Sequence, residues 1–391
     1  MTHFPHDDPR AALAVLRAKL VGWLANEAYP RWAQHGIESD GAFFESLGQD
    51  GLGIPDPRRA RVQPRQVFAF AQAPALGWRG DARGIVRRGI DHFRAHYRRG
   101  DGLYRTVVDT GGAPLDERAV LYDQAFALLG FASAAAALDA RGEFEAHALD
   151  LRGAIERLMG AGDGSFRSDL ERADLRESNP HMHLLEACLA WVGVGGDASW
   201  SDWVRGLVEL ARTRFIRTDD GRTDNGALGE QFTAAWQPVP GIGGRIIEPG
   251  HQFEWAWLLL RCEPILRSPP RATALRLISI AEEYGVHNGV AVNQLLDDMS
   301  VADADARLWP QTERLKAAVL AATLTGESRY WSMAHAAALS LFPYLATPVA
   351  GLWFDVRRPN GALTGAAAPA STFYHVVGAI AALNTALGPS G

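Results

Sequence analysis

Apolar residues recur at helical spacing in twelve segments of this 391-residue chain, and the connections between these segments alternate in length. Five connections are short, at 79–81, 141–142, 193–198, 263–269 and 325–326, and six are long, at 35–63, 100–116, 160–179, 217–248, 288–304 and 347–369. A short connection makes two helices antiparallel neighbours, so all the long loops fall at one end. This pattern predicts an all-α (α/α)6 toroid of six helical hairpins, with an inner and an outer ring.

The predicted helices begin at Asp8-Pro9, an N-cap followed by proline. The others are expected near 64–78, 82–99, 117–140, 143–159, 180–192, 199–216, 249–262, 270–287, 305–324, 327–346 and 370–387. A β-hairpin is expected near Leu103–Val108, and another hairpin or a lid between Asp219 and Glu248. No linker divides the chain, so one domain covering residues 1–391 is expected.

Composition excludes several classes of function. The net charge of −6 disfavours binding to nucleic acid or to an anionic membrane. No run of 18 apolar residues and no secretory signal segment is visible. Cys188 and Cys262 are the only cysteines, and both lie in apolar helical segments, which favours a reducing cytoplasm. We expect a cytoplasmic monomer or homodimer with no nucleic-acid or membrane partner.

The stretch Pro249-Gly250-His251-Gln252-Phe253-Glu254-Trp255 places an imidazole and a carboxylate on one face of a helix start. A buried histidine beside a helix-capping acid is an equally good explanation of this stretch alone. Similar polar groups, however, recur near the start of each predicted inner helix, at intervals of about 60 residues. They are Arg65, Asp123, His183 with Glu186, His251 with Glu254, Gln311 with Glu313, and His375. In a toroid these helices surround one pocket, where the groups are expected to meet.

Three histidines and an arginine suit proton transfer at a carbon next to a carbonyl, which needs an acid, a base and donors for the enediolate oxygen. A zinc site at His181, His183 and Glu186 is the alternative. Positions two apart face different sides of a helix, so His181 and His183 are not expected to share an ion. No metal and no cofactor is therefore expected.

These segments resemble motifs of the N-acylglucosamine 2-epimerase family, which includes mannose isomerases, cellobiose 2-epimerases and a sulfoquinovose-related aldose–ketose isomerase. The similarity covers about residues 60–380. It rests on Arg65-Gln66-Val67-Phe68, Tyr122-Asp123-Gln124-Ala125-Phe126, Asn179-Pro180-x-Met182-His183-x-x-Glu186-Ala187, Pro249-Gly250-His251-x-x-Glu254-Trp255 and Trp309-Pro310-Gln311-Thr312-Glu313. The resemblance implies an (α/α)6 fold and metal-free proton transfer through a cis-enediol.

Carried over by position, the resemblance implies that His251 and His375 are the acid/base pair. His183 would bind the sugar, Arg65 would hold the oxygens around C1 and C2, and Glu254 would orient His251. The other motif positions expected to contact the sugar are Asp123, Asn179, Glu186, Trp309, Gln311 and Glu313.

The chain is therefore predicted to be a sugar aldose–ketose isomerase of the mannose/fructose type, acting on a monosaccharide. A 2-epimerase using the same residues is the close alternative. A glycoside hydrolase using a pair among Asp123, Glu254, Glu313 and Asp355 is a more distant one, and a helical scaffold without activity is the last. A disaccharide or phosphorylated substrate stays open; no particular arginine is assigned to a phosphate, and Arg245, just before the Pro-Gly-His motif, is the first to consider.

Overall fold

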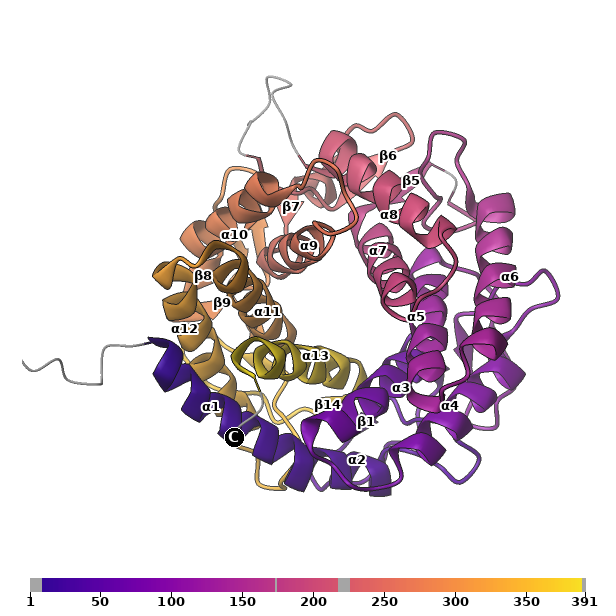
Figure 1. The fold of residues 1–391 in the computed structure, drawn as a ribbon, viewed down its shortest axis with the longest axis horizontal. Helices are drawn as coiled ribbons and strands as arrows, with labels where there is room; N and C mark the ends of the chain where they lie inside the picture. Colours follow the sequence, from indigo (N-terminus) through magenta and orange to yellow (C-terminus); the bar gives the residue numbers. More distant parts are fainter. Residues whose placement is uncertain (1–8, 173, 217–225, 389–391) are drawn as a thin grey trace, which may run out of the picture.

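The computed structural model describes residues 9–172, 174–216 and 226–388, and its helices form two concentric rings (Figure 1). The inner ring consists of α3 (Val62–Gln72), α5 (Leu121–Leu138), α7 (Ser178–Gly193), α9 (Pro249–Arg261), α11 (Leu308–Thr325) and α13 (Ala370–Leu387). The outer ring consists of α1 (Pro9–Trp23), α4 (Ala82–Tyr97), α6 (Arg141–Met159), α8 (Ser199–Leu210), α10 (Arg271–Gly285) and α12 (Ser328–Leu345). The predicted (α/α)6 toroid is confirmed.

The two rings differ in how their helices are buried, as their sequences require. Outer helices are amphipathic and bury one stripe; α4, for example, buries Ile85, Ile90 and Phe93. Inner helices are buried more completely, and α5 is buried from Asp123 to Ala135. By length and composition α5 and α13 could cross a membrane, yet 78% and 56% of these segments are buried inside the protein. Both are core helices of the toroid.

The first outer helix is extended, and the ring closes beside it. A π-helical turn (Leu24–Ala28) joins α1 to α2 (Tyr29–His35). From α2, Trp32 stacks on Trp353 and Phe373, with ring centroids 5.0 and 5.5 Å away. Helix α13 packs against both α3 and α11, so the last inner helix lies next to the first. These aromatic contacts therefore stabilise the junction between the two ends of the chain.

Short antiparallel strands join the long loops into a belt at one end of the rings. In each loop the residues just before the inner helix pair with the next loop around the ring. The pairs are β2 (Arg58–Arg59) with β3 (Val107–Val108), Val120 with Asp169, β5 (Leu175–Glu177) with β6 (Gln231–Thr233), β7 (Ile246–Ile247) with β10 (Gln294–Leu296), β12 (Ala306–Arg307) with β13 (Val356–Arg357), and β14 (Ala368–Pro369) with β1 (Ser46–Leu47). The belt fixes the start of every inner helix relative to its neighbour.

The remaining strands form local hairpins. The hairpin expected after residue 103 is present, because β3 pairs with β4 (Pro114–Asp116). β8 (Val286–His287) pairs with β9 (Val290–Ala291), and β10 pairs with β11 (Val301–Asp303). The hairpin expected within 219–248 is present in the described part, because Phe232 of β6 pairs with Pro238, and the N–H groups of Thr233 and Val239 donate to the C=O groups of Gln237 and Gln231. β6 and β7 also pair with neighbouring loops, and residues 217–225 lie outside the described residues.

A repeated amide contact attaches four of the long loops to their inner helices. A buried glutamine accepts from the N–H, and donates to the C=O, of a single loop residue, with distances of 2.7–3.0 Å. The pairs are Gln63 with Phe43, Gln124 with Tyr104, Gln252 with Leu228 and Gln311 with Ala291. On α7, His181 takes this place and accepts from the N–H of Phe166 at 3.1 Å. On α13, Phe373 stacks on Trp353 instead, at 5.6 Å. Gln311 and His181 are therefore structural residues.

We expect Gln311→Met to lower the free energy of unfolding by about 1–3 kcal/mol, because it leaves the buried N–H and C=O of Ala291 unpaired. The kcat of the folded enzyme should not change, since the amide contacts the loop backbone and not the cavity described below. Urea denaturation and initial rates measure the two effects. The control is Gln237→Met at an exposed position. A loss of kcat with unchanged stability would contradict this assignment.

Candidate active site

A cavity of about 300 Å3 lies where the inner helices begin, inside the belt of strands. This volume is at the lower end for small-molecule sites and suits a monosaccharide. Its lining is mainly polar and includes residues from the first, middle and last thirds of the chain. The lining residues are Arg59, Arg61, Arg65, Tyr122, Asn179, Glu248, His251, Glu254, Arg307, Trp309, Ser371, Thr372 and His375. The predicted acid/base pair, His251 and His375, thus faces a single cavity.

His251 lies in the first turn of α9 and is held by two carboxylates. Its Nδ1 is 2.9 Å from Oε2 of Glu230 and 3.5 Å from Oε2 of Glu248. Burial lowers the pKa of His251, but the charges of Glu230 and Glu248 outweigh burial and raise this pKa to about 10. At neutral pH His251 is therefore an imidazolium, which can donate a proton.

The residue that orients His251 is Glu230, not Glu254 as the sequence suggested. Glu254 lies one turn further along α9 and its Oε1 has no hydrogen-bond partner among the described residues. Glu230 was missed because it lies in a long loop, 21 positions before the histidine, where no helical spacing connects the two. Its Oε2 also accepts a hydrogen bond from the hydroxyl of Ser178, and its Oε1 accepts from the N–H of Glu248.

His375, on α13, has the opposite electrostatic environment. Its Nδ1 is 2.8 Å from Oε1 of Glu313, and the Oε2 of Glu313 is 2.7 Å from Nζ of Lys316. Burial, followed by the positive charges of Arg65 and Lys316, holds the pKa of His375 well below its usual value. At neutral pH the ring is uncharged. With Nδ1 engaged by the carboxylate, Nε2 is the nitrogen left to act as a base.

Trp309, at the start of α11, lies beside both catalytic candidates. Its ring centroid is 5.2 Å from that of His251 and 5.5 Å from that of His375. Gly250 makes this position possible, because a Cβ there would come within 2.4 Å of the indole. The indole therefore forms a flat apolar wall between the imidazolium and the neutral imidazole, as aromatic faces often do in sugar sites.

Arg65, on α3, is buried and has no carboxylate partner among the described residues. It donates to the hydroxyl of Tyr122, and its guanidinium lies 4.0 Å from the ring centroid of Phe126. Its Nε has no partner within the described chain. A buried arginine with free donors can stabilise oxygen atoms of a bound ligand that gain negative charge.

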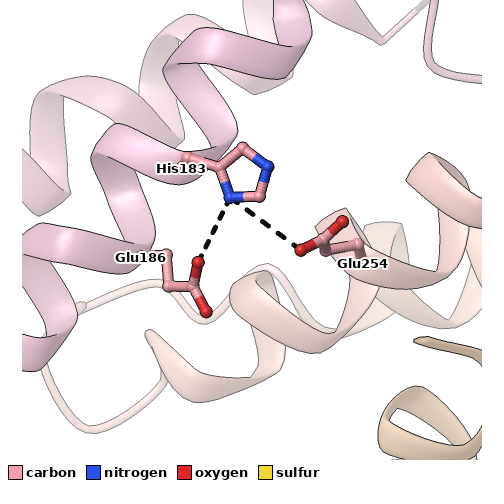
Figure 2. Close-up of side chains that lie close together, drawn as sticks. All are labelled: His183, Glu186 and Glu254. Atoms are coloured by element: carbon pink, nitrogen blue, oxygen red, sulfur yellow. Dashed lines mark hydrogen bonds and ion pairs between the residues drawn. The ribbon is translucent and has the colours of Figure 1, made fainter. Parts of the chain in front are cut away.

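A buried cluster lies behind the cavity wall, where α7 and α9 face each other (Figure 2). The Nδ1 of His183 points between Oε2 of Glu186, at 3.2 Å, and Oε1 of Glu254, at 4.0 Å. Burial lowers the pKa of His183 to about 4 despite its bond to Glu186, and burial raises the pKa of Glu254 well above its usual range. Glu186 also accepts from the hydroxyl of Tyr374.

This cluster offers ligand atoms for a metal ion. His183, Glu186 and Glu254 place theirs within 4.8 Å of one another, as do Glu254, Glu313 and His375. A cation already lies among these acids, because the charges of Glu313, Glu254 and Glu186 all raise the pKa of Lys316, against the effect of burial. His181 takes no part in the cluster and faces the loop backbone, as its spacing predicted.

The structure divides the predicted site residues into two groups. Lining the cavity are Arg65, Asn179, His251, Glu254, Trp309 and His375. Not lining it, among the residues that the structure describes, are Asp123, His183, Glu186, Gln311 and Glu313. Of these, Asp123 is fully buried and binds Arg61 at 2.9 Å, so it positions an arginine of the cavity.

Several lining residues were missed, chiefly Arg59, Arg61, Tyr122, Glu248, Arg307, Ser371 and Thr372. Arg59, Arg61 and Glu248 lie in or directly after the strand belt, in segments predicted to be loops. Tyr122, Arg307, Ser371 and Thr372 lie at the starts of predicted helices but were not assigned to the site. Arg245, the first arginine considered for a phosphate, lies elsewhere on the surface in ion pairs with Asp297 and Asp298.

Glu230→Gln is expected to move the alkaline limb of the pH–rate profile toward neutral pH. The carboxylate of Glu230 does most to raise the pKa of His251 against burial, so removing its charge lets this imidazolium lose its proton at lower pH. The kcat measured from pH 5 to 11 tests this. Glu209→Gln, at an exposed position of α8, is the control and should keep the wild-type profile. An unchanged profile for Glu230→Gln would show that His251 does not act as the acid.

Comparison with known proteins places these residues in a family. The model of the N-acylglucosamine 2-epimerase (GlcNAc 2-epimerase) family matches residues 42–379. The chain belongs to this family. A mannose-6-phosphate isomerase of Rhizobium meliloti (strain 1021) is 42% identical over 379 residues, which cover 94% of this chain and 97% of the relative.

Two further similarities are to D-mannose isomerases. A D-mannose isomerase of Pseudomonas cannabina pv. alisalensis is 28% identical, over 79% of this chain and 81% of the relative. A solved D-mannose isomerase has the same fold, with a TM-score of 0.84 and 22% identity over 98% of this chain and all of the other. The predictions of family and of a sugar isomerase or epimerase are thereby confirmed.

Proposed function

We propose that the chain interconverts an aldose and a ketose of the mannose/fructose type, through a cis-enediol, with His251 and His375 as its acid and base. The observation that carries this proposal is the pair of imidazoles that face one cavity in opposite protonation states. The names of the relatives support the substrate class, since one is a mannose-6-phosphate isomerase and another is a D-mannose isomerase. We also propose that residues 1–391 form one domain and act in the cytoplasm as a monomer or homodimer.

In the proposed reaction, the open-chain aldose lies with C1 and C2 between the two imidazoles. Neutral His375 removes the proton from C2 through Nε2, while the imidazolium of His251 donates a proton to O1. Arg65 stabilises the oxygens of the enediolate as they gain charge. His375 then returns its proton to C1 and His251 accepts the proton of O2, which yields the ketose and restores both residues. No redox step is required.

A 2-epimerase remains the second candidate, because an imidazolium on the other side of the enediol can protonate C2 instead. Incubation with D-mannose in D2O separates the two reactions. Deuterated fructose is expected for the isomerase, whereas deuterated glucose would replace the proposal by epimerisation. Recovery of undeuterated mannose alone would contradict both. Dialysis against EDTA should leave the rate unchanged; a loss that divalent metal restores would assign metal chemistry to the cluster of His183, Glu186 and Glu254.

The geometry does not favour a glycoside hydrolase. Of the acids that were candidates for a carboxylate pair, Glu254 lines the cavity, whereas Asp123, Glu313 and Asp355 do not, in the described chain. The other acid of the lining, Glu248, lies 3.5 Å from Nδ1 of His251 and supports that imidazolium. Asp355 instead binds Arg307 at 3.0 Å and accepts from the hydroxyl of Thr372 at 2.8 Å. Inverting or retaining hydrolysis needs two carboxyl groups on opposite sides of the scissile bond.

A further inference from the structure

The outer part of the cavity is lined by arginines that the proposed proton transfer does not use. Arg59, Arg61 and Arg307 line the same cavity as the catalytic candidates. Their side chains are 44%, 26% and 42% exposed, whereas those of His251 and His375 are 9% and 8% exposed. The arginines therefore form a rim above the imidazoles, and we call Arg59, Arg61 and Arg307 the arginine rim.

Each arginine of the rim uses some of its guanidinium nitrogens to bind a carboxylate and leaves the others without a partner among the described residues. The Nε of Arg61 donates to Asp123, and the Nε of Arg307 donates to Asp355. Arg59 uses its Nε and Nη2 to bind Glu45. Within the described residues, no partner is found for Nη1 of Arg59 or for either terminal nitrogen of Arg61 and Arg307. A held guanidinium with free donors is suited to binding phosphate oxygens in pairs.

The position of the arginine rim follows from the order of the inner helices. Helix α13 lies between α3 and α11 (Figure 1). Arg59 and Arg61 precede α3, and Arg307 precedes α11, so the rim flanks the start of α13. There Ser371 and Thr372 line the cavity, and His375 lies one helical turn deeper. A hexose with C1 and C2 beside His375 therefore directs its far end toward the rim.

The charges around the cavity favour an anion. Each arginine of the rim is paired with one carboxylate, and His251 is paired with Glu230, but Arg65 has no carboxylate partner among the described residues. We propose that the arginine rim binds an anionic group on the far carbon of the sugar, so that the substrate is a hexose 6-phosphate. This inference rests on the proposed function.

The test compares kcat/KM for D-mannose, D-mannose 6-phosphate, D-mannose 6-sulfate and D-mannuronate. We expect the phosphate ester to exceed D-mannose by at least about tenfold, since one charge-assisted hydrogen bond contributes about 10–100-fold in affinity. Its advantage should shrink as salt rises, because the rim is partly exposed. A sulfate ester or uronate that exceeds the phosphate would assign the rim to that anion and overturn the 6-phosphate.

Variants of the rim sharpen the comparison. Arg307→Met should lower kcat/KM for D-mannose 6-phosphate by about 10–100-fold and lower the ratio of the phosphorylated to the free sugar. Arg307→Lys keeps the charge but loses the paired donors, so its kcat/KM for D-mannose 6-phosphate should lie between the values of the wild type and of Arg307→Met. Arg245→Met is the matched control. Arg245 is also 44% exposed and paired with aspartates, but it lies outside the cavity, so its replacement should leave kcat/KM unchanged for both substrates.

Calorimetric binding of mannitol 6-phosphate and mannitol separates the failure of this inference from failure of the proposed function. If neither aldose is converted but mannitol 6-phosphate binds tightly and Arg307→Met abolishes its binding, the proposed reaction is wrong and the anion site stands. If D-mannose and its 6-phosphate are converted equally well, the anion site is overturned and the isomerase stands. Equal binding of the two alditols overturns the site even if Arg307→Met proves unstable.

Discussion

His375→Asn is expected to lower kcat by about 10²–10⁴-fold, which is the usual contribution of a positioned acid or base. Asparagine fills similar space and can still accept or donate a hydrogen bond with Glu313, but it cannot take the proton from C2. Because the neutral ring acts on the substrate after binding, KM should change much less than kcat. Initial rates of ketose formation measure both constants.

The control for this variant is His335→Asn on α12, in the outer ring and away from the cavity lining. It should keep the wild-type kcat. The incorporation of deuterium from D2O into recovered mannose should fall in parallel with kcat for His375→Asn, since both require removal of the C2 proton. If His375→Asn exchanges the C2 proton of mannose at the wild-type rate but forms no ketose, His375 acts after removal of the C2 proton.

Lys316→Met is expected to lower the free energy of unfolding by about 3–5 kcal/mol, the usual cost of removing one partner of a buried ion pair. Lys316 is 2% exposed and Glu313 is fully buried; the ammonium also lies 3.8 Å from the ring centroid of Trp257. Without Lys316, the cluster of Glu186, Glu254 and Glu313 has lost its cation. Urea denaturation followed by tryptophan fluorescence measures the loss.

The same variant should move the acidic limb of the pH–rate profile to higher pH. The charge of Lys316 helps burial and Arg65 to lower the pKa of His375, so its removal raises that pKa, and the neutral base then forms only at higher pH. Lys19→Met is the natural control, because Lys19 is exposed and is the only other lysine of the chain. Adding Glu313→Gln to Lys316→Met should recover part of the stability. A Lys316→Met protein as stable as Lys19→Met would contradict the buried pair.

The fold could be predicted because helix periodicity and connection length are local properties of the sequence. The site could be predicted only in part. Helical spacing identified which turns face inward, but it did not separate a residue that lines the cavity, such as His375, from one that supports it, such as Glu313. Gln311 was misplaced for a similar reason: its amide faces a loop residue 20 positions earlier.

What the sequence could not reveal is the pairing between loops. Glu230 lies in a segment without helical periodicity, Arg307 lies in a two-residue strand where a helix was predicted to begin, and such short strands leave no detectable alternation. Arg59 and Arg307 face one cavity although 248 residues separate them, because β2 and β12 each precede an inner helix. Such proximity depends on the closure of the ring, which no local pattern of residues encodes.

The belt of strands also determines which parts of this enzyme can change independently. Each pair ties the residue before one inner helix to the following loop, and the last pair, β14 with β1, returns to the first loop. Segments beyond these pairs, such as the tip between β10 and β11, can lengthen or shorten without shifting the helix starts. Substrate range can therefore diversify through insertions at the tips, while the distance between the proton donor and the proton acceptor stays constant.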